Sequence, residues 1–259
     1  MTDGDRYALP NRDDAADARL RALGELLDPV TFRHLEALGI ARTWRCWEVG
    51  AGGPSVARWL AARAGYVLAT DLDVSRLGAP DGVEVRVHEL GKDPLPARDL
   101  DLVHARLVLT HVPARDAALR ELASALRPGG WLVIEDADPA IQPLACLDAH
   151  DAAAELANRL RVAFRALLAD RGADLAFGRT LPRRLREAGL VEVGADAYFP
   201  LALPACATLE RATVAQVGDR LVERGLATRA ELAEHLANLD AGRVDVSVSP
   251  LVSAWGRKK

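Results

Sequence analysis

The sequence has little cysteine, no excess of basic charge and no long apolar run, and each shortage excludes a class of protein. Its three cysteines, Cys46, Cys146 and Cys206, are scattered within apolar segments, which favours reduced thiols and a cytoplasmic protein over a disulfide framework. No apolar stretch approaches the roughly 18 residues of a membrane-spanning helix. The polar, acidic first residues are unlike a secretion signal.

The charge balance and the size of the chain narrow the field further. Lys and Arg total 33 and Asp and Glu 37, for a net charge of −4, so the basic face of a nucleic-acid-binding protein is not expected. With 259 residues, half of them hydrophobic, the chain can form one large α/β domain. We therefore expect a small-molecule partner, with no nucleic acid and no membrane; the oligomeric state stays open.

The hydrophobic pattern alternates between strands and helices in an α/β order. A break is expected in the first helix at Asp28-Pro29, with a second helix from Thr31 to Leu38 after it, because proline cannot continue a helical hydrogen-bond pattern. The predicted strands are 44–49, 66–70, 83–88, 99–104, 131–134, 191–203 and 244–255, and the main predicted helices are 13–38, 113–127, 148–170, 181–188, 207–225 and 228–240.

Residues 44–73 carry the most informative pattern in the chain. A short apolar strand ends in the glycine-rich turn 50–53, and Pro54-Ser55 is typical of a helix start. A second strand then ends at Asp71, about 20 residues past the glycines. This is half of a nucleotide-binding βαβ unit, in which the acid binds a ribose hydroxyl.

Further acids follow later strands. Glu89 comes after the predicted strand 83–88, and Glu135 and Asp136 come after the strand 131–134. Ligands of parallel sheets bind at the carboxyl ends of the strands, so the glycine turn, Asp71 and Glu89 predict one nucleotide site. Glu135, Asp136 and Asp138 could supply oxygens for a magnesium ion, but adjacent residues of a strand point to opposite faces, so a metal site there is not expected.

Five motifs at this spacing resemble the class I S-adenosylmethionine-dependent methyltransferases, of the small-molecule type common in actinobacteria. The resemblance covers nearly the whole chain. The motifs are Glu48–Gly53, Ala69–Asp73, His88–Leu90, Asp101–Arg106 and Leu126–Leu132.

The resemblance implies a Rossmann-like, seven-stranded, mostly parallel sheet with flanking helices, a helical lid and an antiparallel last strand. The chain would be a single domain, 1–259. Its parts would be an N-terminal helical cap (1–43), a cofactor-binding core (44–136), a helical lid with a late strand (137–243) and the last strand (244–259).

The resemblance also assigns residues to the cofactor S-adenosylmethionine. The methionine part would lie against Glu48, Gly50, Ala51, Gly52, Ala105 and Arg106; Asp71 would bind the ribose, Leu72 would pack on the adenine, and Glu89 and Leu90 would meet its edge. One position departs from the family pattern: Pro54 stands where a third glycine is usual. We expect this proline to stiffen the turn.

Methyl transfer asks mainly for alignment of the acceptor with the methyl group, and for a base only if the acceptor must lose a proton. His111 and Asp136 are the candidate catalytic residues, followed by His150, whereas His104 lies within a predicted strand and is expected to be packed. The apolar, alanine-rich lid favours a hydrophobic small molecule as acceptor.

Two alternatives remain at this point. The turn nearly matches the dinucleotide fingerprint, which would suit an NAD(P)-dependent oxidoreductase, but the fingerprint lacks its last glycine and no Tyr-x-x-x-Lys pair appears. A protein that binds S-adenosylmethionine for regulation, without methyl transfer, would share the cofactor site.

Overall fold

The computed structural model describes residues 14–78 and 80–259, and these form two compact units. The sheet unit comprises residues 27–138, 176–198 and 251–259. The helical unit comprises the described residues up to 26, together with 139–175 and 199–250. Residues 1–13 of the predicted cap lie outside the described residues. The boundaries of cap, core and lid within a single domain stay a prediction.

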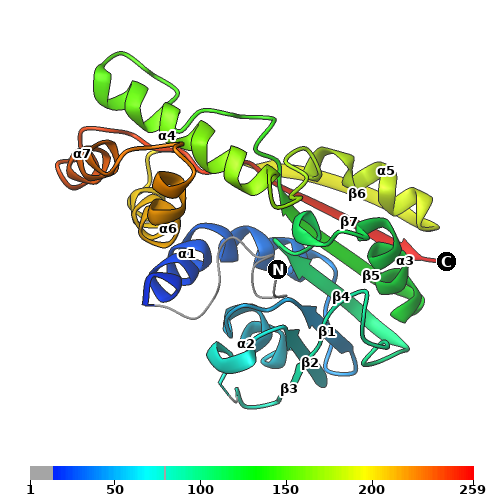
Figure 1. Ribbon diagram of the computed structural model, residues 1–259. Helices are drawn as coiled ribbons and strands as arrows, with labels where there is room; N and C mark the ends of the chain where they lie inside the picture. Colours follow the sequence, from blue (N-terminus) through cyan, green and yellow to red (C-terminus); the bar gives the residue numbers. More distant parts are fainter. Residues whose placement is uncertain (1–13, 79) are drawn as a thin grey trace. The chain divides into compact units, whose positions relative to one another are not determined.

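The sheet unit contains seven strands in the order β3-β2-β1-β4-β5-β7-β6 (Figure 1). Strands β1 to β5 pair in parallel, and β7 runs antiparallel to both of its neighbours. This confirms the predicted mostly parallel sheet with an antiparallel last strand. The strands are β1 (Arg45–Val49), β2 (Tyr66–Asp71), β3 (Val83–Val87), β4 (Leu100–Arg106), β5 (Leu126–Ala137), β6 (Leu190–Tyr198) and β7 (Leu251–Lys258).

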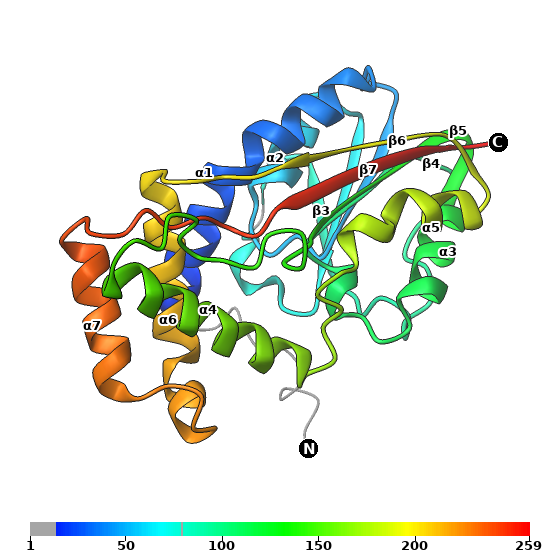
Figure 2. The same ribbon diagram turned by 90° about the horizontal axis from the view of Figure 1, so that it is seen from above.

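Helices cover both faces of the sheet, and Figure 2 shows them on its two sides. Helices α3 (Arg115–Ala125) and α5 (Leu181–Glu187) bury Leu119, Leu122 and Leu185 against one face. On the other face lie α2 (Ser55–Ala61) and the last turns of α1 (Asp14–Ala37). Helices on both sides explain why the central strands β1, β2 and β4 are buried along almost their whole length, including charged residues such as Glu48 and Asp101.

Helix α1 is continuous, so the predicted break at Asp28-Pro29 is wrong. Pro29 lies inside the helix and removes one backbone hydrogen bond. The side chains beside it compensate, because Arg106 donates to both Asp28 and Thr31 and so attaches this part of the helix to β4. Tertiary contacts outweigh the local preference of the proline.

Several strand boundaries also differ from the prediction. Strand β6 ends at Tyr198 and not at residue 203. Strand β5 starts at Leu126, because Leu126 already pairs with Leu100 before the Pro128–Gly130 segment, and the register then shifts. At Gly130 a Cβ atom would lie 2.7 Å from the carbonyl oxygen of Leu100, so the strands meet closely only because no side chain is there. Strand β7 starts at Leu251, since the preceding segment belongs to the helical unit.

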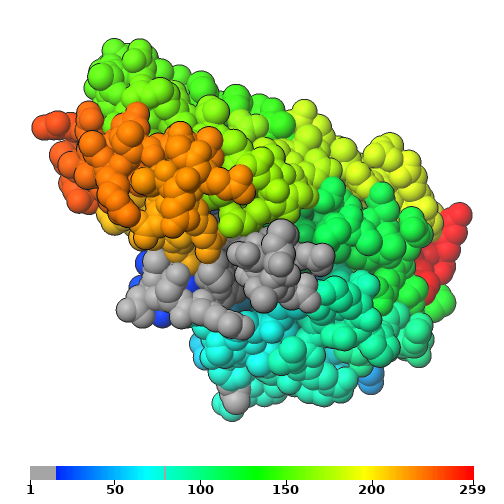
Figure 3. Space-filling view, viewed as in Figure 1, coloured from blue at the N-terminus to red at the C-terminus, as the bar shows by residue number. Residues whose placement is uncertain are grey.

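The helical unit is built from α4 (Ala152–Ala169), α6 (Pro204–Glu223), α7 (Arg229–Asp240) and the first turns of α1. All three later helices were predicted. Their apolar faces share a core that includes Leu160, Val217 and Leu232. Helices α4 and α7 lie side by side on the surface of this unit (Figure 3). A capping box at Thr228 and Glu231 starts α7.

Within the described residues, no helix is both long and apolar enough to span a membrane.

Candidate functional site

The turn that follows β1 accepts only glycine at two positions. Gly50 and Gly52 both have a φ of 61°, a left-handed conformation that other residues rarely adopt. At Gly50 an added Cβ would also collide with Cγ2 of Val108. No atom lies within 4 Å of the corresponding position at Gly53, where the turn is open. The chain therefore makes a sharp exit from the sheet, without side chains to obstruct a ligand.

The N–H groups of this turn already bond within the chain. Ala51 donates to the carbonyl oxygen of Thr70 (3.0 Å), Gly52 to Oδ2 of Asp71 (2.8 Å) and Gly53 to the carbonyl oxygen of Ala51 (2.5 Å). The turn is thus tied to the end of β2. A ligand can therefore approach the backbone of the turn closely, but it finds few free N–H donors there.

Asp71 stands at the end of β2 with half of its hydrogen-bonding capacity in use. Its Oδ1 accepts from the N–H of Asp73 (3.0 Å) and its Oδ2 from that of Gly52. A carboxylate has about four acceptor positions, so about two are left for the hydroxyl groups of a ribose. The next residue, Leu72, leaves an apolar side chain 62% exposed, which suits a flat apolar ring.

His88 is the residue at this site that the sequence analysis did not single out. Its backbone N–H donates to the carbonyl oxygen of Asp71 (3.0 Å), and its ring meets Trp47 edge-on at 5.6 Å. The side chain is buried, yet neither ring nitrogen has a hydrogen-bond partner in the described part of the chain. An unpaired buried imidazole in the residue that directly follows β3 fits a site built to receive a polar ligand. The motif His88–Leu90 was the available signal.

Glu89 and Leu90 follow β3. Glu89 is ion-paired with Nζ of Lys92 at 2.7 Å, and both side chains are exposed. Its backbone N–H donates to Oδ2 of Asp93. Leu90 packs partly on the sheet core. Glu89 is thus exposed at the carboxyl end of β3, on the same edge of the sheet as Asp71.

Glu48 and His104 belong to a buried network that attaches α1 to the sheet. Nδ1 of His104 lies 2.5 Å from Oε2 of Glu48, and its Nε2 lies 3.4 Å from Glu135. Glu135 also accepts from Thr31 and His34 of α1. Burial alone would lower the pKa of His104, but the two carboxylates outweigh it and raise the pKa to about 9. His104 is fully buried, as expected from its place within a strand.

Arg106 and Ala105 lie at the end of β4, close to this network. Arg106 donates to Oγ1 of Thr31 (2.9 Å) and to Oδ1 of Asp28 (2.8 Å), and Ala105 is buried. Glu48, Ala105 and Arg106 therefore lie at the ends of the neighbouring strands β1 and β4, where β1 leads into the glycine turn, and the polar groups of Glu48 and Arg106 bond to the chain itself.

Asp136 holds the short helix η3 (Leu109–His111) in place. Its Oδ1 accepts from the hydroxyl of Thr110 (2.7 Å) and its Oδ2 from the N–H of Thr110 (3.1 Å). Burial raises the pKa of this carboxyl to about 6, against these hydrogen bonds. His111 directly follows Thr110 in the sequence, and it is only partly buried. Asp136 thus orients the segment that carries His111.

The acids at the end of β5 have separate partners and do not converge. Glu135 contacts α1, Asp136 contacts η3, and Asp138 forms two hydrogen bonds with the guanidinium of Arg179. Within residues 14–78 and 80–259, no group of three His, Cys, Asp or Glu side chains could hold a metal ion. His150, the remaining candidate base, is exposed in the helical unit beside Asp148.

Comparison with known proteins supports the methyltransferase resemblance. Residues 47–134 match the family described as "Methyltransferase domain". The chain is 28% identical over 221 residues to a ubiquinone biosynthesis O-methyltransferase of Burkholderia pseudomallei, which covers 78% of this chain and 91% of that protein. It is 29% identical over 175 residues to methyltransferase str2 of Strobilurus tenacellus, covering 65% of this chain but only 61% of that protein.

Known structures share the fold at low sequence identity. A Haemonchus contortus phosphoethanolamine N-methyltransferase 2, in complex with S-adenosyl-L-methionine, matches with a TM-score of 0.60 and 14% identity, covering 96% of this chain and 58% of that one. YcgJ of Bacillus subtilis matches with a TM-score of 0.59 and 13% identity, covering 90% and 99%.

These matches favour methyl transfer over the oxidoreductase alternative, since the matched residues 47–134 contain the glycine turn, Asp71 and Glu89. The sheet order and the antiparallel β7 agree with the fold that the resemblance implied. Over residues 47–134 the chain matches the methyltransferase domain, and together these findings support a class I methyltransferase, whose methyl donor is S-adenosylmethionine.

Proposed function

We propose that the sheet unit binds S-adenosylmethionine at the carboxyl ends of β1 to β4, and that the protein transfers its methyl group to a small, apolar acceptor. One observation carries the assignment. Asp71 bonds the glycine turn through Gly52 and keeps about two acceptor positions unused, beside a turn that has no side chain at Gly50 and Gly52. This is the arrangement that a ribose next to a backbone-bound ligand requires.

The proposed contacts follow from the positions of the residues. Asp71 would bind the ribose hydroxyls, and the exposed side chain of Leu72 would pack on the adenine. Glu89 and Leu90 would meet the edge of the adenine, and the unpaired ring of His88, which contacts Trp47, adds a polar group at the carboxyl end of β3. The methionine part would lie over Gly50, Ala51 and Gly52, beside Glu48, Ala105 and Arg106.

The bound cofactor would supply an already activated methyl group. The protein then has to align the acceptor with it, an effect worth up to about 7–11 kcal/mol in the best intramolecular models. His111 is the proposed general base, because it is partly exposed on η3. Asp136, which is buried, is proposed to act through η3 by fixing Thr110 and thereby the position of His111.

The acceptor class rests on two supports. The helical unit has an apolar core of leucine, valine and alanine side chains. The Burkholderia relative is named as an O-methyltransferase of ubiquinone biosynthesis. We therefore propose a hydroxyl group on a small apolar molecule as the methyl acceptor, in a cytoplasmic enzyme of the small-molecule type that the sequence resembles in actinobacteria.

Calorimetry tests the cofactor site. We expect S-adenosylmethionine to bind with micromolar affinity, and Asp71→Ala to abolish binding. Asp81→Ala, an exposed aspartate in the turn before β3, should leave the affinity unchanged. No binding by the unaltered protein would overturn the proposal.

Mass spectrometry of phenolic and hydroxylated apolar acceptors tests methyl transfer. We expect methylated products, and a lower kcat for His111→Gln without a change in cofactor affinity. Cofactor binding without turnover across the acceptor panel would instead favour a binding protein that does not transfer methyl.

A further inference from the structure

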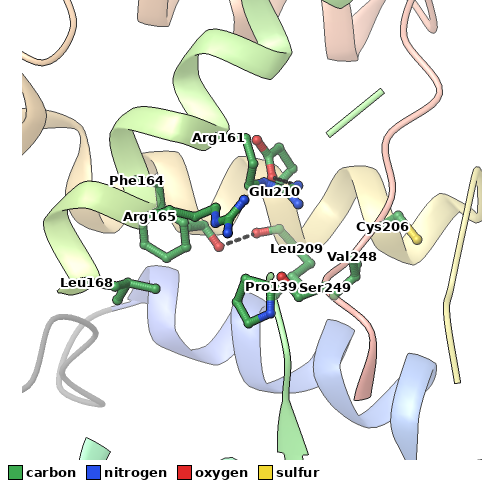
Figure 4. A pocket seen from close by; sticks show the side chains of 11 residues that line it. Pro139, Arg161, Phe164, Arg165, Leu168, Cys206, Leu209, Glu210, Val248 and Ser249 are labelled. Carbon is green, nitrogen blue, oxygen red and sulfur yellow. Dashed lines mark hydrogen bonds and ion pairs between the residues drawn. The ribbon is translucent and has the colours of Figure 1, made fainter. Parts of the chain in front are cut away.

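The helical unit contains a cavity of about 80 Å³ between α4, α6 and the segment that precedes β7 (Figure 4). One part of its wall is apolar, with Phe164, Leu168 and Leu209. The other part is ionic and contains two arginines, Arg161 and Arg165, and one acid, Glu210. A cavity with apolar walls and a few convergent polar groups is the usual form of a small-molecule site.

Arg161 is the central polar group of this cavity. Its side chain is only 8% exposed. Both of its hydrogen bonds to described residues use Nη2, which donates to Oε2 of Glu210 (2.9 Å) and to the carbonyl oxygen of Ser247 (2.9 Å). A guanidinium carries five N–H donors, so the three on Nε and Nη1 remain for an acceptor. Since Arg161 lines the cavity, that acceptor can come from a ligand there.

Glu210 and His235 fix the direction of this guanidinium. Oε1 of Glu210 lies 3.3 Å from Nε2 of His235, which is completely buried. Burial alone would raise the pKa of Glu210, but the charge of Arg161 and the contact with His235 lower it to about 2. Glu210 is therefore ionised at neutral pH. It bonds Nη2 of Arg161, and the N–H groups on Nε and Nη1 stay available to a ligand.

We propose that this cavity binds the acid end of a small organic carboxylate. The remaining N–H donors of Arg161 match the two oxygens of a carboxylate, a pairing that is stronger than a neutral hydrogen bond. Phe164, Leu168 and Leu209 provide apolar contact for the carbon atoms next to the acid group. The limited volume fits the carboxylate and a few carbons of a larger molecule. Neither cofactor binding nor methyl transfer is required for this site.

Calorimetric titration of the full chain tests the proposal. The probes are 3-methylbutanoate and benzoate, each paired with its amide, which keeps the shape and removes the charge. We expect both acids to bind, and the amides to bind at least about tenfold more weakly. Arg161→Gln should abolish binding of the acids. Arg159→Gln is the matched control, because Arg159 lies on the same helix but is 60% exposed beside Glu231.

A second variant keeps the test decisive if Arg161→Gln fails to fold. Arg161→Gln leaves Glu210 without its partner and could unfold the helical unit. Arg161→Lys keeps the positive charge but loses the planar fork, so it should fold, as circular dichroism would show, and bind the acids at least about tenfold more weakly. Unchanged binding by Arg161→Lys and Arg161→Gln, equal binding of acids and amides, or no binding of any acid would each overturn the proposal. Cofactor titrations on the same samples separate that failure from a failure of the proposed function.

Discussion

Each unit of the protein has a buried ionic network, and the two networks differ in how completely they are satisfied. In the sheet unit, Glu135 accepts from four side chains, among them His34 and His104. In the helical unit, Arg161 donates hydrogen bonds to Glu210 and Ser247 from only one of its three side-chain nitrogens. A filled network attaches one element to another, whereas one with unused donors beside a cavity can also bind a ligand.

The two networks thus use buried charge for different purposes: one attaches elements of the fold to each other, and the other can also bind a ligand. The network around Glu135 joins α1 to β4, β5 and β7 through contacts between residues about 100 positions apart in the sequence. The network around Arg161 joins α4 to α6 and to the segment before β7. Removing the central carboxylate of each network should therefore affect the two units unequally.

The largest effect is expected for Glu135→Ala. This change leaves two histidines buried without their shared carboxylate, and it should lower the free energy of unfolding by about 3–5 kcal/mol. Glu210→Ala should cost less, because the cavity beside Arg161 can admit water to the exposed donors. Urea unfolding of both variants measures the difference. Glu187→Ala, in an exposed pair with Arg183, is the control and should unfold almost as the unaltered protein does. Equal losses for Glu135→Ala and Glu210→Ala would contradict the distinction between the networks.

The pH dependence of stability should come mainly from the sheet unit. The pKa of His104 is raised from 6.5 to about 9, so its stabilising contribution is complete below about pH 6.5 and is lost as the pH rises through 9. That contribution is on the order of 3 kcal/mol, since one pKa unit corresponds to about 1.4 kcal/mol. The pKa of Glu135 is lowered: burial alone would raise it, but the histidines outweigh burial, so its contribution is lost as the pH falls below its ordinary range.

Unfolding curves between pH 6 and 10 measure this loss. His104→Gln should flatten the alkaline decline, whereas His150→Gln, which changes an exposed histidine, should leave it as it is. An unchanged decline in His104→Gln would show that another group titrates there.

Much of the sheet unit could be predicted from the sequence, because its signals are local. Apolar runs mark the parallel strands, and glycines with positive φ mark the turns between β1 and α2. Asp71 could be placed at a strand end for the same reason, and the structure agrees.

The errors and omissions have long-range causes. Pro29 predicted a break, but contacts of Asp28 and Thr31 with Arg106, more than 70 positions away, keep α1 continuous. The cavity around Arg161 depends on residues about 50 and 86 positions further along the chain, and no local pattern announces it. His88 lay within a recognised motif, yet only its burial without a partner marks it as a site residue.

Gly50→Ala tests whether the two units bind their ligands independently. The added methyl group would collide with Val108 at a φ that alanine rarely adopts, so the turn must move and cofactor affinity should fall at least about tenfold. Binding of 3-methylbutanoate in the helical unit should not change. Gly53→Ala is the matched control, because the space around that position is open. Calorimetry with both ligands gives the result, and Gly50→Ala/Val108→Ala should recover part of the affinity. Loss of both ligands in Gly50→Ala would show that the units are coupled.

The smallest effect concerns Pro54, which caps α2 where the family has glycine. Its φ of −82° suits proline, and α2 begins directly after it at Ser55. Pro54→Gly should lower the free energy of unfolding by about 0.5–1 kcal/mol, because glycine gives the unfolded chain more freedom. Cofactor affinity should stay within about twofold, since the N–H groups next to it at Gly52 and Gly53 already bond inside the chain. Urea unfolding and cofactor titration measure the two quantities, with Pro128→Gly as a control outside the site. A tenfold gain in affinity for Pro54→Gly would mean that the missing N–H of Pro54 weakens cofactor binding. The glycine turn would then resemble the cavity around Arg161, because an N–H donor there would be available to a ligand.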